Sequence, residues 1–280
     1  MKFKIRHEST YLFDGKVFLE PHCLRFRPRK TSFLEVLDFS IAIHASPRGH
    51  KIVVDEENNM VDFCWFEGMI DQLYIKAESV LEISPFNPFD FIIQPEHYNR
   101  LPFAYDAFQH KLLFATLDAK VLSPELINYG NNVLEESNYN TISFLIQLTK
   151  KIHTDFMVVY REAGPPMLPN ETFTCKQGSC RDLSWMLIHL IRHNGIAARF
   201  TSGYYYFEME NPAYELHAWV EVFLPGTGWI GLDASHGILT GNTHFPMVSS
   251  AHFNHTMPVS GSIRGSASSV LNTKLSIEKI

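Results

Sequence analysis

Several features that would narrow the class of this protein are scarce in its 280 residues. Only four cysteines are present, Cys23, Cys64, Cys175 and Cys180, and a chain of this length can fold without disulfides, so we expect free thiols. No stretch approaches the roughly 20 apolar residues that span a bilayer, and the N-terminus does not open into the apolar core of a secretory signal. The sequence therefore predicts no membrane partner and a cytoplasmic location.

Runs of basic residues are also missing. The formal net charge is −6 and the pI is near 6.1, which gives no general attraction to phosphate backbones, so we do not expect a nucleic-acid partner. Apolar residues make up 45% and charged residues 19%, a balance typical of packed domains rather than of a disordered chain. The length allows one large or two modest domains, and we expect two. The sequence does not indicate an oligomeric state.

Residues 1–85 are dominated by period-two alternation, which is typical of half-buried strands. Phe3, Ile5 and His7 share one face of the first such segment, and turn residues such as Pro47-Arg48-Gly49 separate the segments. This pattern predicts an antiparallel β-sandwich domain over residues 1–85, without a catalytic constellation. Residues 86–139 are rich in proline and predict an irregular connection with helical segments.

Residues 140–280 mix helical and strand patterns and predict a catalytic domain that ends in a wrapping or partly mobile tail. Apolar residues at helical spacing indicate helices over 141–156 and 179–194. Strand-like stretches follow at 196–206, 217–224 and 229–233, and the Pro225-Gly226-Thr227-Gly228 turn predicts that the last two are antiparallel neighbours. The whole chain is thus expected to be α+β.

The most informative single residue is Cys180, at the first turn of the second predicted helix. A thiolate is a far better nucleophile than a thiol, and the positive end of a helix dipole favours the thiolate. The unpaired N–H groups of the first turn could also hold an oxyanion, and Gly178 would allow a substrate to approach the backbone. The alternative is that Cys180 is a small buried apolar side chain, a common environment for free cysteine.

A base and an orienting group for such a nucleophile occur further along the chain. His217 begins a predicted strand, and the following hairpin brings Asp233 back toward it, with Leu224 expected to pair with Trp229. Taken alone, His217 reads as an ordinary strand histidine and Asp233 as a turn residue. Together with Cys180 they match the three roles of a catalytic triad, which are the nucleophile, the base and the group that orients the base.

Four blocks in this order resemble the bacterial transglutaminase-like proteins of the papain-like superfamily. They are Gly178-Ser179-Cys180-Arg181-Asp182, Gly195-Ile196-Ala197-Ala198-Arg199 with Gly203-Tyr204, His217-Ala218-Trp219-Val220-Glu221-Val222, and Gly228-Trp229-Ile230-Gly231-Leu232-Asp233. The N-terminal part, with His7, Tyr11 and residues 24–29, is similar to the β-domain that precedes the core in that group.

The resemblance implies a papain-like, transglutaminase-like core in which Cys180 is the nucleophile, His217 the general acid and base, and Asp233 the orienter. It implies no metal or organic cofactor. The family commonly has Pro-Thr after the aspartate, whereas this chain has Ala234-Ser235, which puts the shape of the substrate site in doubt.

The expected reaction is acyl chemistry on an amide bond of a peptide or protein substrate through a thioester acyl-enzyme. Hydrolysis of a peptide or isopeptide bond is preferred over transamidation to an amine. Two alternatives stay open: a non-catalytic peptide- or protein-binding module that retains the fold, and an acyltransferase that uses a thioester donor. A zinc site at Cys175, Cys180, His189 and His193 is disfavoured because the cysteines lack C-x-x-C spacing.

Overall fold

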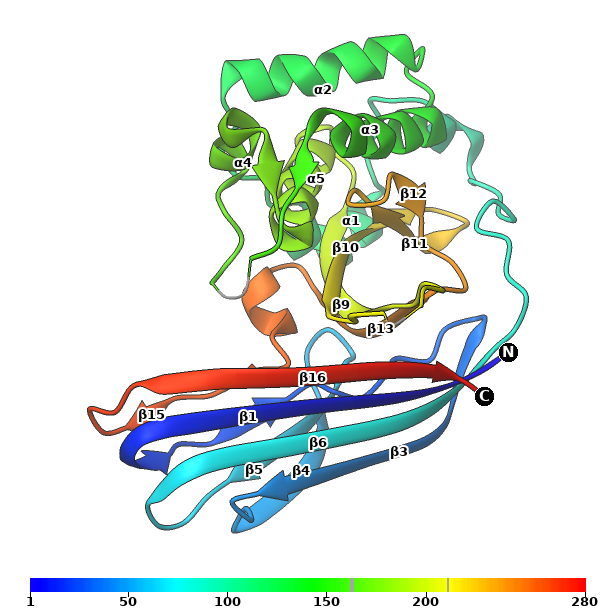
Figure 1. The fold of residues 1–280 in the computed structure, drawn as a ribbon. Helices are drawn as coiled ribbons and strands as arrows, with labels where there is room; N and C mark the ends of the chain where they lie inside the picture. Colours follow the sequence, from blue (N-terminus) through cyan, green and yellow to red (C-terminus); the bar gives the residue numbers. More distant parts are fainter. Residues whose placement is uncertain (162–163, 211) are drawn as a thin grey trace.

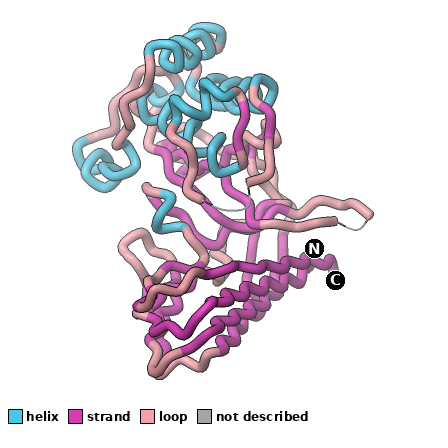
Figure 2. The backbone as a smooth tube through the Cα atoms, turned by 60° about the vertical axis from the view of Figure 1, so that its left-hand side comes forward, coloured by secondary structure: helices cyan, strands magenta, loops and turns pink. Residues whose placement is uncertain are grey.

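The structure, a computed structural model, describes residues 1–161, 164–210 and 212–280 (Figure 1). It is divided into a β-domain of long strands and an α/β part that carries all the labelled helices. Figure 2 shows the same division, with helix confined to one half of the molecule and the two labelled ends of the chain side by side in the other. The α+β class with an antiparallel N-terminal β-domain is confirmed. Among the described residues, no helix has the length and apolar character needed to cross a membrane.

The β-domain is a sandwich of two antiparallel sheets. The larger sheet has the order β15-β1-β6-β3, with β16 also paired to β1, and the smaller sheet has the order β14-β2-β5-β4. The strand bounds are β1 Lys2–Leu19, β2 His22–Leu24, β3 Leu34–His44, β4 Gly49–Val54, β5 Met60–Trp65, β6 Ile70–Ile83, β14 Val259–Ser260, β15 Ile263–Arg264 and β16 Ser269–Lys279. Every second residue of β6 from Leu73 to Ile83 is buried, as the alternation predicted, and Leu73 and Ile75 pack with Leu24 and Cys64 in the core.

The end of the chain belongs to this sandwich. Strand β16 pairs with β1 over its whole length, from Phe3 opposite Lys279 to Phe13 opposite Ser269. The sequence analysis assigns these residues to the tail of the 140–280 domain, whereas the structure pairs them with β1 of the N-terminal β-domain. The apolar pattern of β16 is weak because it is an edge strand whose side chains are mostly exposed, Ile277 being buried.

Helices surround one long buried helix in the α/β part. The bounds are η1 Glu96–Asn99, α1 Ala107–Leu117, α2 Pro124–Glu136, α3 Thr141–Asp155, α4 Pro169–Cys175, α5 Cys180–His193 and η2 Phe253–Thr256. Helix α5 contacts α1, α2, α3 and α4 as well as three strands, and every residue from Asp182 to Arg192 is buried. The predicted helix 141–156 ends one residue later than α3. The predicted helix 179–194 begins one residue earlier and ends one residue later than α5.

A curled antiparallel sheet packs against α5. Its order is β12-β11-β10-β9-β13, with bounds β9 Ala198–Tyr205, β10 Leu216–Leu224, β11 Gly228–Asp233, β12 Ile238–Leu239 and β13 His244–Ser250. A short parallel pair, β7 Met157–Val158 and β8 Gln177–Gly178, leads into α5. Ala218, Val220 and Val222 of β10 join the helices in one apolar core.

The two parts of the molecule share a buried interface. Phe3, Ile5 and Leu81 of the β-domain pack with Tyr204 of β9 and Phe245 of β13. Beside this apolar cluster, His7 of β1 lies 3.1 Å from the Tyr204 hydroxyl through its Nδ1 atom. The β-domain thus supports the strands from which the candidate site is built.

Candidate active site

The helix that carries Cys180 begins at a tightly defined point. Ser179 is the N-cap residue, and Asp182 Oδ2 accepts hydrogen bonds from its backbone N (2.7 Å) and its Oγ (2.8 Å). A Cβ atom at Gly178 would lie 2.7 Å from Asp182 Cβ, so only glycine fits there. This packing fixes Cys180 as the first helical residue, where backbone N–H groups lack intrahelical acceptors.

The same carboxylate ties a neighbouring loop to the helix start. Asp182 Oδ1 accepts from the Met167 backbone N at 2.7 Å and from the Arg161 guanidinium. Burial alone would raise the pKa of Asp182, but the hydrogen bonds from Arg161, Met167 and Ser179 hold it below its usual value. Asp182 is therefore an ionised cap that ties Arg161 and Met167 to the start of the helix beside Cys180.

The structure brings His217 into contact with both Cys180 and Asp233. His217 Nε2 lies 2.7 Å from Asp233 Oδ2, and this leaves Nδ1 for the hydrogen bond with Cys180. Burial would lower the pKa of His217, but the negative charge of Asp233 and the hydrogen bonds to Asp233 and Cys180 raise it to about 10. The ring is thus held in the protonated form that an ion pair with a thiolate requires.

The hairpin that joins β10 to β11 differs from the predicted register by one residue. Leu224 pairs with Gly228 rather than Trp229, because Gly228, at φ +84°, already occupies the first strand position. Continuing this register beyond Val220 and Leu232 puts Asp233 opposite Trp219, on the same face as His217. In the predicted register Asp233 would stand opposite Val220, and its side chain would point to the other face.

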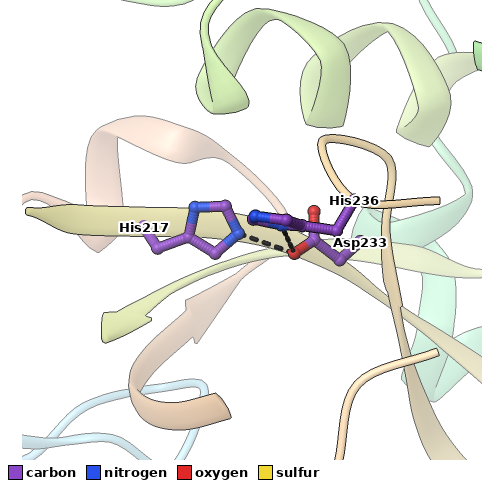
Figure 3. A group of neighbouring side chains, drawn as sticks. All are labelled: His217, Asp233 and His236. Atoms are coloured by element: carbon purple, nitrogen blue, oxygen red, sulfur yellow. Dashed lines mark hydrogen bonds and ion pairs between the residues drawn. The ribbon is translucent and has the colours of Figure 1, made fainter. Parts of the chain in front are cut away.

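Asp233 is a completely buried carboxylate that accepts hydrogen bonds from three imidazoles. One oxygen, Oδ2, lies 2.7 Å from His217 Nε2, 2.7 Å from His236 Nδ1 and 3.1 Å from His244 Nε2. Figure 3 shows His217 and His236 meeting at this oxygen. Burial raises the pKa of Asp233, but the charge of His217 and the hydrogen bonds of all three rings hold it well below its usual range.

The three histidines differ in exposure and therefore in what they can do. His244 is 1% exposed, and burial lowers its pKa more than Asp233 raises it, so it is a neutral donor to Asp233. The His217 side chain is 11% exposed and that of His236 is 38% exposed. The ring of Tyr205 lies against all three, with centroid distances of 5.4 Å to His217, 4.3 Å to His236 and 4.8 Å to His244.

The cluster around Asp233 contains residue types that can bind a metal ion. Among the described residues, His217, Asp233 and His236 form one group whose ligand atoms all lie within 4.8 Å of one another. Two of these distances are the 2.7 Å hydrogen bonds, so protons on the nitrogens account for the short separations. The cysteine and histidine set that the sequence analysis disfavoured is not drawn together in the described parts of the chain, and His189 Nδ1 instead accepts from Lys120 N at 3.0 Å.

Sequence reasoning found the three candidate residues and missed the groups around them. His236 lies three residues after Asp233, in a turn that the backbone of Ser235 closes by donating to Asp233 Oδ1 at 2.9 Å. That Asp-Ala-Ser-His segment was read only as a turn, although i, i+3 spacing is the signal that the two side chains could meet. Nothing in the sequence indicated that His244, at the start of β13, would reach the same carboxylate.

Comparisons with known proteins identify the family. Residues 132–234, which include α3, α4, α5 and the strands β9, β10 and β11, match the transglutaminase-like superfamily. Residues 3–82 match the bacterial transglutaminase-like N-terminal region. The two segments together make up more than half of the chain, and the chain belongs to the bacterial transglutaminase-like proteins that combine this N-terminal region with this core.

Individual relatives are distant. A crystal structure of a proposed cysteine protease from Cytophaga hutchinsonii superposes with a TM-score of 0.71 at 19% identity, covering 100% of this chain and 91% of that one, and it shows the shared fold. Uncharacterised proteins of Mycobacterium tuberculosis and Mycobacterium bovis are 26% identical over 149 residues, which is 49% of this chain and 47% of theirs. The chain thus spans about half the length of the curated relatives it matches.

Proposed function

We propose that this protein is a cysteine-based acyl-transfer enzyme in which Cys180 is the nucleophile, His217 the general acid and base, and Asp233 the orienting carboxylate. The observation that carries the proposal is that His217 interacts with Cys180, at the start of a helix, and lies 2.7 Å from Asp233 Oδ2 through its Nε2 atom. Membership of a superfamily of cysteine-based enzymes supports it, since the three residues lie where that chemistry needs them.

The reaction follows from these groups. The Cys180 thiolate attacks an amide carbonyl, the oxyanion that forms lies near the first-turn N–H groups of α5, and protonated His217 gives its proton to the departing amine. A thioester acyl-enzyme remains, and an acceptor from solvent then releases the acyl group. We favour water as the acceptor and a peptide or isopeptide bond in a protein as the substrate, which makes the protein a peptidase or amidase. An amine acceptor would make it a transglutaminase.

The first test does not need a known substrate. Iodoacetamide alkylation of each of the four cysteines, followed by mass spectrometry from pH 5 to pH 10, compares the wild type with His217→Ala. Cys180 is expected to react well below pH 8, and His217→Ala should remove that advantage, while exposed Cys175 serves as the internal reference thiol. If Cys180 and Cys175 titrate alike in the wild type, the active-enzyme proposal fails and the binding module becomes the better explanation.

A second test distinguishes water from an amine as the acceptor of the acyl group. Peptide libraries incubated with the enzyme, with and without a diamine such as cadaverine, report either cleaved peptides or amine-modified ones. Cys180→Ala is the control, and a residual cellular function in that variant would favour the non-catalytic module. Turnover of acyl-thioesters with none of peptides would instead identify an acyltransferase.

A further inference from the structure

Asp233 is paired with His236 as well as with His217, in addition to the buried His244. His217 uses Nε2 to reach Oδ2 and turns its other nitrogen to Cys180, so both of its ring nitrogens are engaged. His236 reaches the same oxygen through Nδ1, from a position three residues along the chain. An imidazole bound to a carboxylate through Nδ1 keeps Nε2 as a site that can take up a proton.

The side chain of His236 is exposed at the surface of the site. Among the described residues, its Nε2 atom makes no hydrogen bond. The side chain is 38% exposed, compared with 11% for His217 and 1% for His244. Of the three rings on Asp233, His236 is therefore the one that a molecule arriving from solvent meets first.

His236 also lies beside His217. Its ring centroid is 5.3 Å from that of His217, and its ring packs against Tyr205 with a centroid distance of 4.3 Å. The turn that carries it is fixed by the hydrogen bond from Ser235 N to Asp233 Oδ1 and by Gly237, whose φ is +68°. The ring is held on the site by the chain itself and does not depend on a bound substrate.

We infer that His236 is a second general base, dedicated to the acceptor that releases the acyl group from Cys180. The inference rests on the proposed function and assigns a role that the triad leaves to His217 alone. When water attacks the thioester carbonyl, its proton passes to His236 Nε2, the C–S bond breaks and the electron pair returns to Cys180 as thiolate. The acid product gives its proton to His217, which restores the ion pair, and His236 returns its proton to solvent.

The test uses p-nitrophenyl acetate, which acetylates a reactive cysteine without specific recognition. Release of p-nitrophenolate measures acetylation, and the mass of the Cys180 peptide over time measures deacetylation. The variant is His236→Asn, because the asparagine amide can replace the Nδ1 donor to Asp233 but has no basic nitrogen at the position of Nε2. The full-length protein is used throughout.

The expected result is a split between the two steps. His236→Asn should acetylate at the wild-type rate and deacetylate about 100-fold more slowly, the usual size of a general-base contribution. The matched control is His244→Gln, which keeps a donor to Asp233 at the Nε2 position of a ring that solvent does not reach. His244→Gln should not slow deacetylation of Cys180 relative to its acetylation.

Three outcomes overturn the inference in distinguishable ways. Deacetylation at the wild-type rate in His236→Asn means that another group is the base. Acetylation and deacetylation slowed equally, in both His236→Asn and His244→Gln, mean that His236 only positions Asp233. A wild-type Cys180 that is never acetylated overturns the proposed function, and this inference with it.

Discussion

Two buried carboxylates on neighbouring strands of the same sheet have opposite kinds of partners. Asp233 at the end of β11 is surrounded by His217, His236 and His244, whereas Glu221 in β10 is paired with Arg29 of the β-domain and Arg199 of β9. Arginine stays charged at any relevant pH, but imidazole gains and loses a proton near neutrality. The first carboxylate therefore has partners that can exchange protons, and the second has partners that hold two parts of the molecule together.

The ionisation of Glu221 reflects its arginine partners. Burial would raise the pKa of Glu221, but the guanidinium groups of Arg29 and Arg199 lower it to about 2, so it stays ionised. Ser249 joins the same network by donating to Glu221 Oε2 at 3.2 Å, and Asn59 of the β-domain donates to the Ser249 carbonyl at 3.0 Å. Such a site has no proton to exchange, and its contribution is to structure. Four experiments test this contrast between Asp233 and Glu221.

The largest effect is expected at Asp233. In Asp233→Asn the negative charge that raises the pKa of His217 is lost, and the amide can present a donor where an acceptor is needed. Acetylation of Cys180 by p-nitrophenyl acetate should fall on the order of 1,000-fold, about 4 kcal/mol of activation free energy. Circular dichroism should show a folded protein. Activity within tenfold of the wild type would mean that Asp233 does not orient His217.

The corresponding substitution at the second carboxylate is Glu221→Gln. It leaves Arg29 and Arg199 without their carboxylate, and breaking a buried pair in this way costs about 3 kcal/mol of unfolding free energy. Urea denaturation measures it, with Glu35→Gln as the control because Glu35 belongs to an exposed pair. The rate of Cys180 acetylation in the protein that remains folded should change little. A large decrease in the acetylation rate with an unchanged unfolding free energy would contradict a structural role for Glu221.

A third carboxylate, Asp182, is intermediate, with one arginine and three further donors. Asp182→Asn cannot accept all of these hydrogen bonds, and we expect a loss of about 2 kcal/mol in unfolding free energy. Because the cap positions Cys180, acetylation should slow about tenfold, a shift of about 1.4 kcal/mol. Ser179→Ala, which removes only the hydroxyl from the same cap, should show a smaller loss of both quantities. Equal losses would mean that the carboxylate adds nothing beyond the hydroxyl.

The last experiment concerns alkaline pH. The pKa of His217 is about 10 in the folded protein and about 6.5 in an unfolded chain, so its protonation stabilises the fold fully below pH 6.5. That contribution is lost as the pH rises through about 10. The unfolding free energy of the wild type should therefore fall more steeply between pH 7 and pH 10.5 than that of His217→Gln. Parallel curves for the two proteins would show that His217 is not charged when folded.

Much of the fold was predictable because local patterns agreed with the final packing. The alternation in β6 and the helical spacing in α3 and α5 each describe one buried face, and the structure buries those faces. The edge strand β16 was not predicted as a strand, since it has little apolar surface to bury and depends on β1 for its hydrogen bonds.

The candidate site was predictable as residue types but not as geometry. Cys180, His217 and Asp233 stand out by their positions at the start or end of an element. The register between β10 and β11 depends on whether Gly228 belongs to the turn or the strand, and a positive φ at a glycine is not visible in the sequence. The contact of His244 with Asp233 arises from the curl of the sheet, which joins β13 to β9 across a long connection.

The pairing of β16 with β1 also constrains the order of folding. Residues 3–13 find their partners at residues 269–279, so one side of the larger sheet cannot be completed until the whole catalytic core has been synthesised. During synthesis β1 can pair with β6 early, but its other edge stays open for the time it takes to make nearly 200 further residues, and open edges promote intermolecular pairing. The contacts of this sheet are of high contact order and should form slowly. In a refolding experiment, the closure of this last strand should therefore follow the assembly of the Cys180 helix and its sheet.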